Sequence, residues 1–303
     1  MRPREWALLL LLSLLWGGSF FFNKLALRDL QPLTVVWART SLAALALLGL
    51  VYLRGENLPT SGRQWQAFGI MGLLNNLLPF SLIVWGQRQI DSSLAAILNA
   101  TTPLFTVVLA HWLTQDERLT RRRLAGVSLG FGGVVVLMGG SLTDLGLQTR
   151  LGEAAVLAAA LSYACAGLYG RRFRGISPTV AAAGMLTCTA VLLLPLVLLI
   201  ERPWQIHPNT TTLAALLGLG LLSTALAYQI YFQILAAAGP TNLLLVTFLI
   251  PISATLLGTL FLQEQLDGRA AVGMALILTG LLAIDGRLLR LLGRRTAEHP
   301  NTN

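Results

Sequence analysis

The sequence is poor in charged residues. They make up only 12% of its 303 residues, while 55% are hydrophobic, and soluble domains typically carry roughly 25% charged residues. A water-soluble fold of this length has no interior large enough for so much apolar surface. We therefore expect an all-α integral membrane protein.

Several kinds of chemistry are also missing. The two cysteines, Cys165 and Cys188, lie inside apolar runs, which favours small buried residues over a disulfide or metal pair. The histidines have no partner at metal-ligand spacing, and no P-loop, nucleophile elbow or HExxH motif occurs. We therefore expect no catalysis, no ATP hydrolysis, no cofactor and no metal.

The formal net charge of +9 raises the question of nucleic acid. Nucleic-acid binding needs a basic stripe on one folded face, whereas the basic residues of this chain stand between long apolar runs. Such placement is typical of loops that orient a protein in a membrane. We expect a lipid bilayer and a small-molecule substrate as partners, and no nucleic acid; the oligomeric state cannot be read, and a monomer is plausible.

Ten apolar segments are long enough to cross a bilayer, which takes about 20 helical residues. The first segment follows the basic residues Arg2 and Arg4, an order that resembles a signal peptide. Because it lacks a clear cleavage site, it is interpreted as a retained helix. The expected spans are Trp6–Leu27, Leu33–Leu53, Trp65–Trp85, Ser92–Leu113, Arg122–Met138, Leu151–Gly170, Thr179–Ile200, Thr211–Leu235, Thr241–Leu262 and Gly268–Ala283.

The basic residues are unevenly divided between the two ends of these spans. Fifteen Lys and Arg residues fall on the side of the amino terminus and six on the other side, with Arg39 inside the second span. Because such an excess marks the cytoplasmic side, we expect a multi-pass protein of the plasma (inner) membrane with both termini in the cytoplasm.

The chain also contains a weak internal repeat at a spacing of about 147 residues. The run from Asp91 aligns with the run from Gly239, which brings Pro103 onto Pro251 and Asn99 onto Thr247. Five spans in each half give the halves opposite orientations, an arrangement common in secondary transporters with a site at the repeat interface. We expect repeats at residues 1–144 and 145–286 around a central cavity, and a basic cytoplasmic tail at 287–303.

Several stretches resemble a known family. The runs WGGSFFFNKLAL, SSLAAILNATTPLFTVVLA, ERLTRRRLAGVSLGFGGVVVLM and FLIPISATLLGTLFLQEQLDGRAAVGMALILTGLLAI are similar to EamA-type carriers of the drug/metabolite transporter superfamily. Within it, the chain looks closest to the YddG-type exporters of aromatic amino acids and methyl viologen. The resemblance implies ten helices around a central cavity and export without ATP hydrolysis.

Candidate substrate-binding residues are polar or aromatic groups deep within the spans, because hydrocarbon leaves polar groups unsatisfied. Hydrogen bonding between helices is the alternative interpretation of the polar ones and core filling that of the aromatic ones. Pro103 and Pro251 are candidate hinges, or static kinks. The binding candidates are Trp16, Arg39, Asn75, Asn76, Asn99, Thr102, Tyr163, Thr224, Tyr228, Tyr231 and Thr247.

The expected function is export of small organic metabolites, with aromatic or neutral amino acids as the first choice of substrate. An exporter of organic cations such as methyl viologen is the alternative within the same class. A membrane-embedded enzyme is disfavoured by the missing acid, base and metal groups, and a scaffold by the lack of a soluble domain.

The topology can be tested with two single cysteines. Introduced at Asn57 and Thr143, they are expected to react with impermeant thiol reagents from opposite faces of the membrane, because an odd number of spans separates them. Labelling in right-side-out and inverted vesicles measures this. Reaction of both from one face would contradict the predicted topology.

Overall fold

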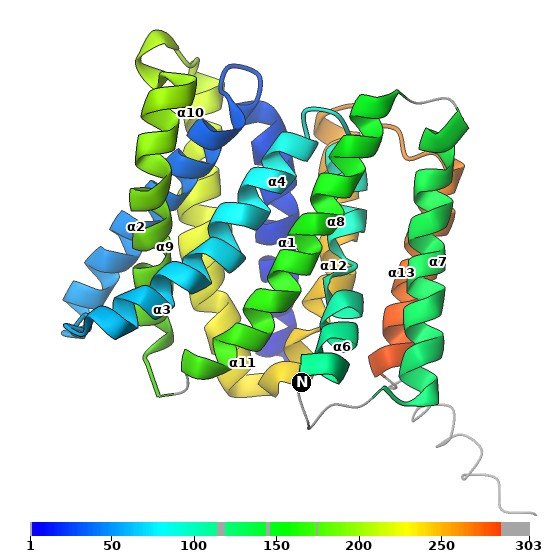
Figure 1. Ribbon diagram of the computed structural model, residues 1–303, viewed down its shortest axis with the longest axis horizontal. Coiled ribbons are helices and arrows are strands. Elements are labelled where there is room, and N and C mark those ends of the chain that lie inside the picture. The colour runs from blue at the N-terminus through cyan, green and yellow to red at the C-terminus, as the bar shows by residue number, and fades with distance from the viewer. Residues whose placement is uncertain (1, 114–118, 144–145, 174, 286–303) are drawn as a thin grey trace, which may run out of the picture.

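The protein is described from a computed structural model, which covers residues 2–113, 119–143, 146–173 and 175–285. Every regular element in these ranges is a helix (Figure 1). The expected tail at 287–303 lies outside the described residues. The helices are α1 Pro3–Ala26, α2 Pro32–Leu53, α3 Gly62–Gly72, η1 Leu73–Leu77, α4 Leu78–Gly86, α5 Ser92–Asn99, α6 Thr102–Leu113, α7 Arg121–Thr143, α8 Leu147–Tyr169, η2 Gly170–Phe173, α9 Pro178–Leu196, η3 Val197–Glu201, η4 Pro203–Gln205, α10 Thr210–Leu217, η5 Gly218–Leu226, α11 Ala227–Leu243, α12 Val246–Phe261 and α13 Gly268–Asp285.

Most of these elements join end to end into membrane-spanning helices. Within the described ranges, nine helices are at least 18 residues long and apolar enough to cross a bilayer, and α12 is apolar but only 16 residues long. The longest, Thr210–Gly239, joins α10, η5 and α11. The fold is therefore that of a multi-pass membrane protein, as the composition predicts.

The fourth and ninth spans differ from the uniform helices expected. The fourth breaks between α5 and α6 at Ala100 and Thr101, and Pro103 then occupies the first turn of α6, where its missing N–H costs nothing. The ninth begins at Val246 rather than Thr241, because Gly239 has a positive φ of 78° and a turn intervenes. Pro251 lies inside α12, so the two prolines occupy different local settings.

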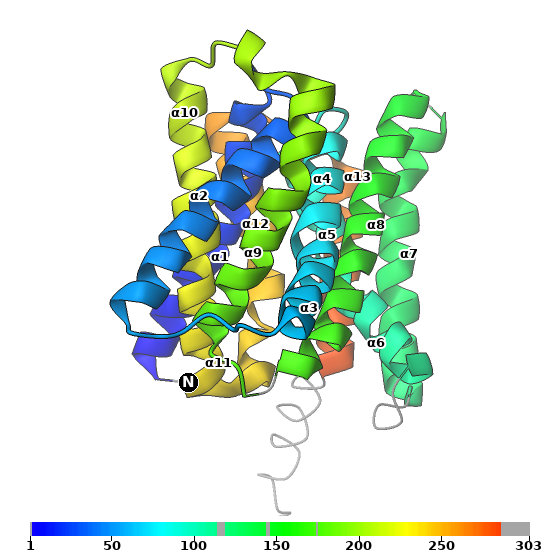
Figure 2. The same cartoon turned by 60° about the vertical axis from the view of Figure 1, so that its left-hand side comes forward.

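One edge of the molecule is a tightly packed helix pair, α7 and α13 (Figure 1). A Cβ added to Gly133 would lie 2.8 Å from the Gly273 carbonyl oxygen, and one on Gly280 would lie 2.5 Å from that of Gly126. Glycine therefore lets these two backbones touch. Helix α1 packs against α12, α11 and α10, and Figure 2 shows this group in a turned view.

The two ends of the bundle are distinguished here by the amino terminus. Figures 1 and 2 place the amino terminus and the ends of α6 and α11 at one end, called the amino-terminal face. The turns between α1 and α2, between α4 and α5, and between α9 and α10 lie at the other end, called the opposite face. On the predicted topology the amino-terminal face is cytoplasmic.

Three carboxylates join helix ends at the opposite face. Asp29, after α1, accepts hydrogen bonds from the Asn209 backbone N–H (2.9 Å) and the Thr212 hydroxyl (2.7 Å) at the start of α10. Glu201, at the end of η3, accepts from the Leu33 and Thr34 backbone N–H groups at 3.0 and 2.6 Å and from the Thr34 hydroxyl at 2.7 Å. Both carboxylates satisfy helix N-terminal donors that the helix itself leaves free.

Glu264 makes the third and most extensive of these contacts. It lies between α12 and α13 and accepts from the backbone N–H and hydroxyl groups of both Ser92 and Ser93, at 2.6 to 3.0 Å, at the start of α5. We call the Asp29, Glu201 and Glu264 contacts the carboxylate clamps. Each one joins an element before residue 140 to an element after residue 146.

The ionisation of Glu264 sets the strength of its clamp. Burial by itself would raise the pKa of Glu264, but the hydrogen bonds from Ser93 and Ser92 outweigh burial and hold the pKa below its ordinary value. The pKa of the neighbouring Asp91 is raised, by burial first and then by the Glu264 charge. The clamp is thus at full strength well above the ordinary carboxyl pKa and is lost as the pH falls through the lowered pKa of Glu264.

Glu264→Gln is expected to loosen the start of α5. Losing one charge-assisted hydrogen bond costs ~1.5–3 kcal/mol, so amide exchange at Ser92 to Leu98 should speed up by about tenfold or more. Hydrogen–deuterium exchange measures this at neutral pH. The matched control is Asp267→Asn in the same loop, because Asp267 caps only its own helix, through the Ala270 N–H. Equal exchange in wild type and the Glu264 variant would contradict the clamp.

Candidate functional site

Arg39 is a buried cation in the first half of α2. Its side chain is 5% exposed. Its Nε donates to the Thr224 hydroxyl oxygen at 2.8 Å, and its guanidinium carbon lies 3.8 Å from the centre of the Phe80 ring. Such a charge at membrane depth marks a functional site by default, because hydrocarbon solvates it poorly.

The polar groups around Arg39 come partly from π-helical turns. Asn75 and Asn76 lie in η1 and Thr224 lies in η5. Such turns leave backbone carbonyls available: the Ser162 hydroxyl donates to the Leu74 carbonyl at 2.7 Å, and the Thr224 hydroxyl donates to the Leu219 carbonyl at 2.7 Å. The π-helix is rare and occurs often at functional sites.

A second polar contact joins η1 to α11. The Asn75 amide donates to the Tyr228 hydroxyl oxygen at 2.8 Å, and that hydroxyl donates to Asn76 Oδ1 at 3.2 Å. Asn76 is fully buried, and its Nδ2 has no hydrogen-bond partner in the described structure. A buried donor left unpaired costs ~1–3 kcal/mol, so this amide is available to an incoming acceptor.

Aromatic rings extend the same region. Trp16 of α1 and Tyr231 of α11 have ring centres 5.6 Å apart, and Tyr231 packs edge-on against Phe232 at 5.2 Å. Tyr163 of α8 lies near Arg39 and Tyr228. Rings offer apolar faces to a ligand and hydroxyl groups to its polar parts.

Eight of the eleven predicted binding residues are therefore brought together. We call them the central cluster: Trp16, Arg39, Asn75, Asn76, Tyr163, Thr224, Tyr228 and Tyr231. Three of its side-chain contacts, Arg39 to Thr224, the asparagine pair to Tyr228 and Trp16 to Tyr231, link an element before residue 140 to one after residue 146.

The other three predicted residues lie at helix breaks. The Thr102 hydroxyl donates to the Asn99 carbonyl at 2.8 Å, and the Thr247 hydroxyl donates to the Leu244 carbonyl at 2.7 Å. The buried Asn99 Oδ1 has no partner among the described residues. These contacts close local turns and do not join the central cluster.

Phe80 and Phe232 belong to the site but were not among the predicted residues. Phe80 follows Asn76 by four positions and so shares its helix face. This spacing could have identified Phe80 from the sequence. Phe232 likewise follows Tyr228 by four positions and stacks on it at 6.2 Å. Apolar rings are so common in these spans that the spacing alone does not distinguish them.

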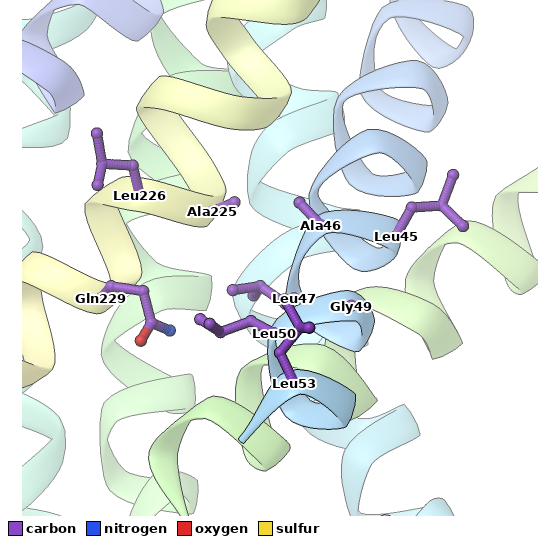
Figure 3. Close-up of a pocket in the computed structure, with 9 residues that line it drawn as sticks. All are labelled: Leu45, Ala46, Leu47, Gly49, Leu50, Leu53, Ala225, Leu226 and Gln229. Atoms are coloured by element: carbon purple, nitrogen blue, oxygen red, sulfur yellow. The ribbon is translucent and has the colours of Figure 1, made fainter. Parts of the chain in front are cut away.

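A groove on the surface of the bundle lies beside this region. It has a volume of about 380 Å³ and lies between α2 and the η5–α11 segment (Figure 3). Its lining is apolar apart from Gln229, and no residue of the central cluster lines it; the lining residues are Leu45, Ala46, Leu47, Gly49, Leu50, Leu53, Ala225, Leu226 and Gln229. The chemistry of the site therefore lies in the central cluster.

The arrangement has the chemistry of a binding site. Across the described part of the chain no group of three or more His, Cys, Asp or Glu residues is placed to hold a metal ion. The central cluster instead offers a cation, a free amide donor and aromatic faces, which suit a small organic molecule with a polar end.

Curated relatives resemble the chain over nearly its whole length. The uncharacterized transporter YoaV of Bacillus subtilis (strain 168) is 25% identical over 89% of this chain and 92% of its own. Protein PecM of Dickeya dadantii is 28% identical over 94% and 93%. A "probable amino-acid metabolite efflux pump" of Salmonella typhimurium is 28% identical over 93% and 94%.

Structure and family comparisons agree in extent. A solved crystal structure covers 94% of this chain and 98% of its own with a TM-score of 0.67 at 21% identity, which shows a shared fold. The model of the EamA-like transporter family matches twice, at residues 4–139 and 150–284. The chain therefore belongs to the EamA-like transporter family.

Proposed function

We propose that the protein exports small amino-acid-type metabolites across the inner membrane, with the central cluster in the substrate path. The observation that carries this proposal is the junction of the two segments matched by the family model: the contacts of Arg39 with Thr224, of Asn75 with Tyr228 and of Trp16 with Tyr231 each join one segment to the other. Relatives described as probable amino-acid metabolite efflux pumps in Salmonella typhimurium and Escherichia coli support the substrate class.

The mechanism we propose is alternating access by two inverted five-helix repeats, residues 1–144 and 145–286. The twofold match to one family model supports the duplication. A site at the junction of two repeats opens to one face and then the other as the repeats rock. The three carboxylate clamps support a state of this cycle in which the opposite face is held together. Both termini would face the cytoplasm, and Pro103 and Pro251 are the proposed hinges.

The cluster also supports aromatic amino acids as substrates, as the resemblance to YddG-type exporters suggests. Trp16, Tyr231 and Phe232 provide ring faces for an aromatic or large apolar side chain. Asn99, Thr102 and Thr247, at the helix breaks, are proposed to meet the substrate as these segments move. Aromatic or neutral amino acids are the first substrates to test.

Counterflow in liposomes tests the function. Purified protein should exchange internal unlabelled substrate for external labelled amino acid, and Tyr228→Ala should reduce this exchange at equal protein content, because it removes the partner of both asparagines. Arg150→Ala, near the start of α8 and away from the cluster, is the control. Absence of counterflow across a full amino-acid panel would contradict the proposal.

The same liposomes address ion coupling. We expect downhill transport without an imposed ion gradient, and no uphill accumulation from a pH step, because the acidic residues fall mostly at helix ends. Glu153 is the exception to examine: it lies inside α8 and is 1% exposed, deeper than the sequence placed it. Accumulation driven by a pH step and abolished by Glu153→Gln would instead establish proton coupling.

A further inference from the structure

We propose that Arg39 binds the carboxylate of the transported molecule, so that the protein selects carboxylate-bearing metabolites over organic cations. The proposal rests on the function proposed above and narrows its substrate class. Three features of the central cluster carry it: an unbalanced positive charge, free donor groups, and an adjacent set of aromatic faces.

The positive charge of Arg39 has only neutral neighbours. Arginine stays protonated in proteins, and the groups that contact this one are the Thr224 hydroxyl and the Phe80 ring. The other ionisable groups near it are the phenols of Tyr163 and Tyr228, which are uncharged at neutral pH. No carboxylate of the described residues pairs with Arg39. Buried charges are normally paired, so the unpaired charge of Arg39 favours an anionic partner from outside the described protein.

The orientation of the guanidinium leaves its best donors free. Thr224 occupies Nε, and Phe80 covers one face of the planar group. Neither terminal nitrogen makes a hydrogen bond to any residue that the structure describes. These two nitrogens form the fork that binds a carboxylate through two parallel hydrogen bonds. A phosphate group would also fit these two nitrogens, so phenyl phosphate is one of the probes.

The surroundings of Arg39 add a second donor and an apolar surface. Asn76 Nδ2 is buried without a partner, and Asn76 Oδ1 accepts a hydrogen bond from the Tyr228 hydroxyl, which lies near Arg39. Asn76 Nδ2 and the Arg39 guanidinium therefore offer free hydrogen-bond donors in the same part of the central cluster. Trp16 and Tyr231 lie beyond Tyr228 on α1 and α11 and would receive the rest of the molecule.

A fixed positive charge also discriminates against other substrates. An organic cation such as methyl viologen would meet Arg39 as a like charge in surroundings of low polarity, where such repulsion is strong. The cation–π contacts that aromatic rings offer are already used on one side by Arg39 itself, over Phe80. The site therefore favours export of amino acids over export of cationic drugs.

The test compares matched probes that differ only at the carboxylate. L-phenylalanine, L-leucine and L-threonine are each measured against their amides in liposome uptake, with methyl viologen as a cation and phenyl phosphate as a phosphate. Wild type is expected to transport at least one acid about tenfold or more faster than its amide. Arg39→Gln should lower that acid-to-amide ratio about tenfold, and Arg39→Lys should restore part of it.

Two controls separate substrate binding from a structural role. Arg54→Gln removes a cation from the end of the same helix, where Arg54 donates to the Thr179 hydroxyl, and should keep the wild-type ratio. Melting temperature and gel filtration show whether each variant folds. If Arg39→Gln fails to fold, the ratio in Arg39→Lys decides, because a lysine lacks the planar fork and should still lower the ratio.

The possible results distinguish the carboxylate inference from the proposed export function. Equal transport of acids and amides by wild type, or an unchanged ratio in both Arg39 variants, would overturn the carboxylate assignment while leaving export intact. Preferred transport of methyl viologen or phenyl phosphate would overturn it in favour of a cation or a phosphate. If wild type moves none of the probes, the proposed function fails, and the carboxylate inference fails with it.

Discussion

Hydrocarbon cannot hydrogen-bond, and this constraint governs where polar side chains can lie in the bundle. A polar group deep in a span needs a partner on another helix, on its own backbone, or in a wet space. In this protein the side-chain contacts near the middle of the spans join helices far apart in the sequence, such as Asn75 with Tyr228 and Arg39 with Thr224. The pairing of these groups thus fixes which helices face one another across the centre.

The polar contacts fall into two layers with different strengths. The carboxylate clamps use charged acceptors and helix N-terminal donors, as in the four hydrogen bonds of Glu264. The central cluster is only partly satisfied, since Asn76 Nδ2 and the terminal nitrogens of Arg39 lack partners in the described structure. The clamps have their hydrogen bonds satisfied, whereas the central cluster keeps unpaired donors. This combination suits a binding site that the clamps close off from the opposite face.

Much of this could be predicted from the sequence because membrane spans have a strong signal. The multi-pass transporter of the EamA family is confirmed, and burial depth alone selected most members of the central cluster. Asn99, Thr102 and Thr247 were placed by the same rule, but they lie at helix breaks. An apolar run does not reveal where a helix is interrupted, and Gly239 shows its positive φ only in the structure. The clamps were missed because Glu201 and Glu264 find their partners 167 to 172 positions away.

The location of the carboxylate clamps has an electrical consequence. Asp29, Glu201 and Glu264 each hydrogen-bond to the start of a helix at the opposite face. A sideways separation of these groups in the plane of the membrane would carry no charge through the field, which acts at ~2.3 kcal/mol per elementary charge per 100 mV. On the proposed mechanism, opening this face would be insensitive to the membrane potential, and voltage would act on the cycle through the charge of the cargo and of Arg39.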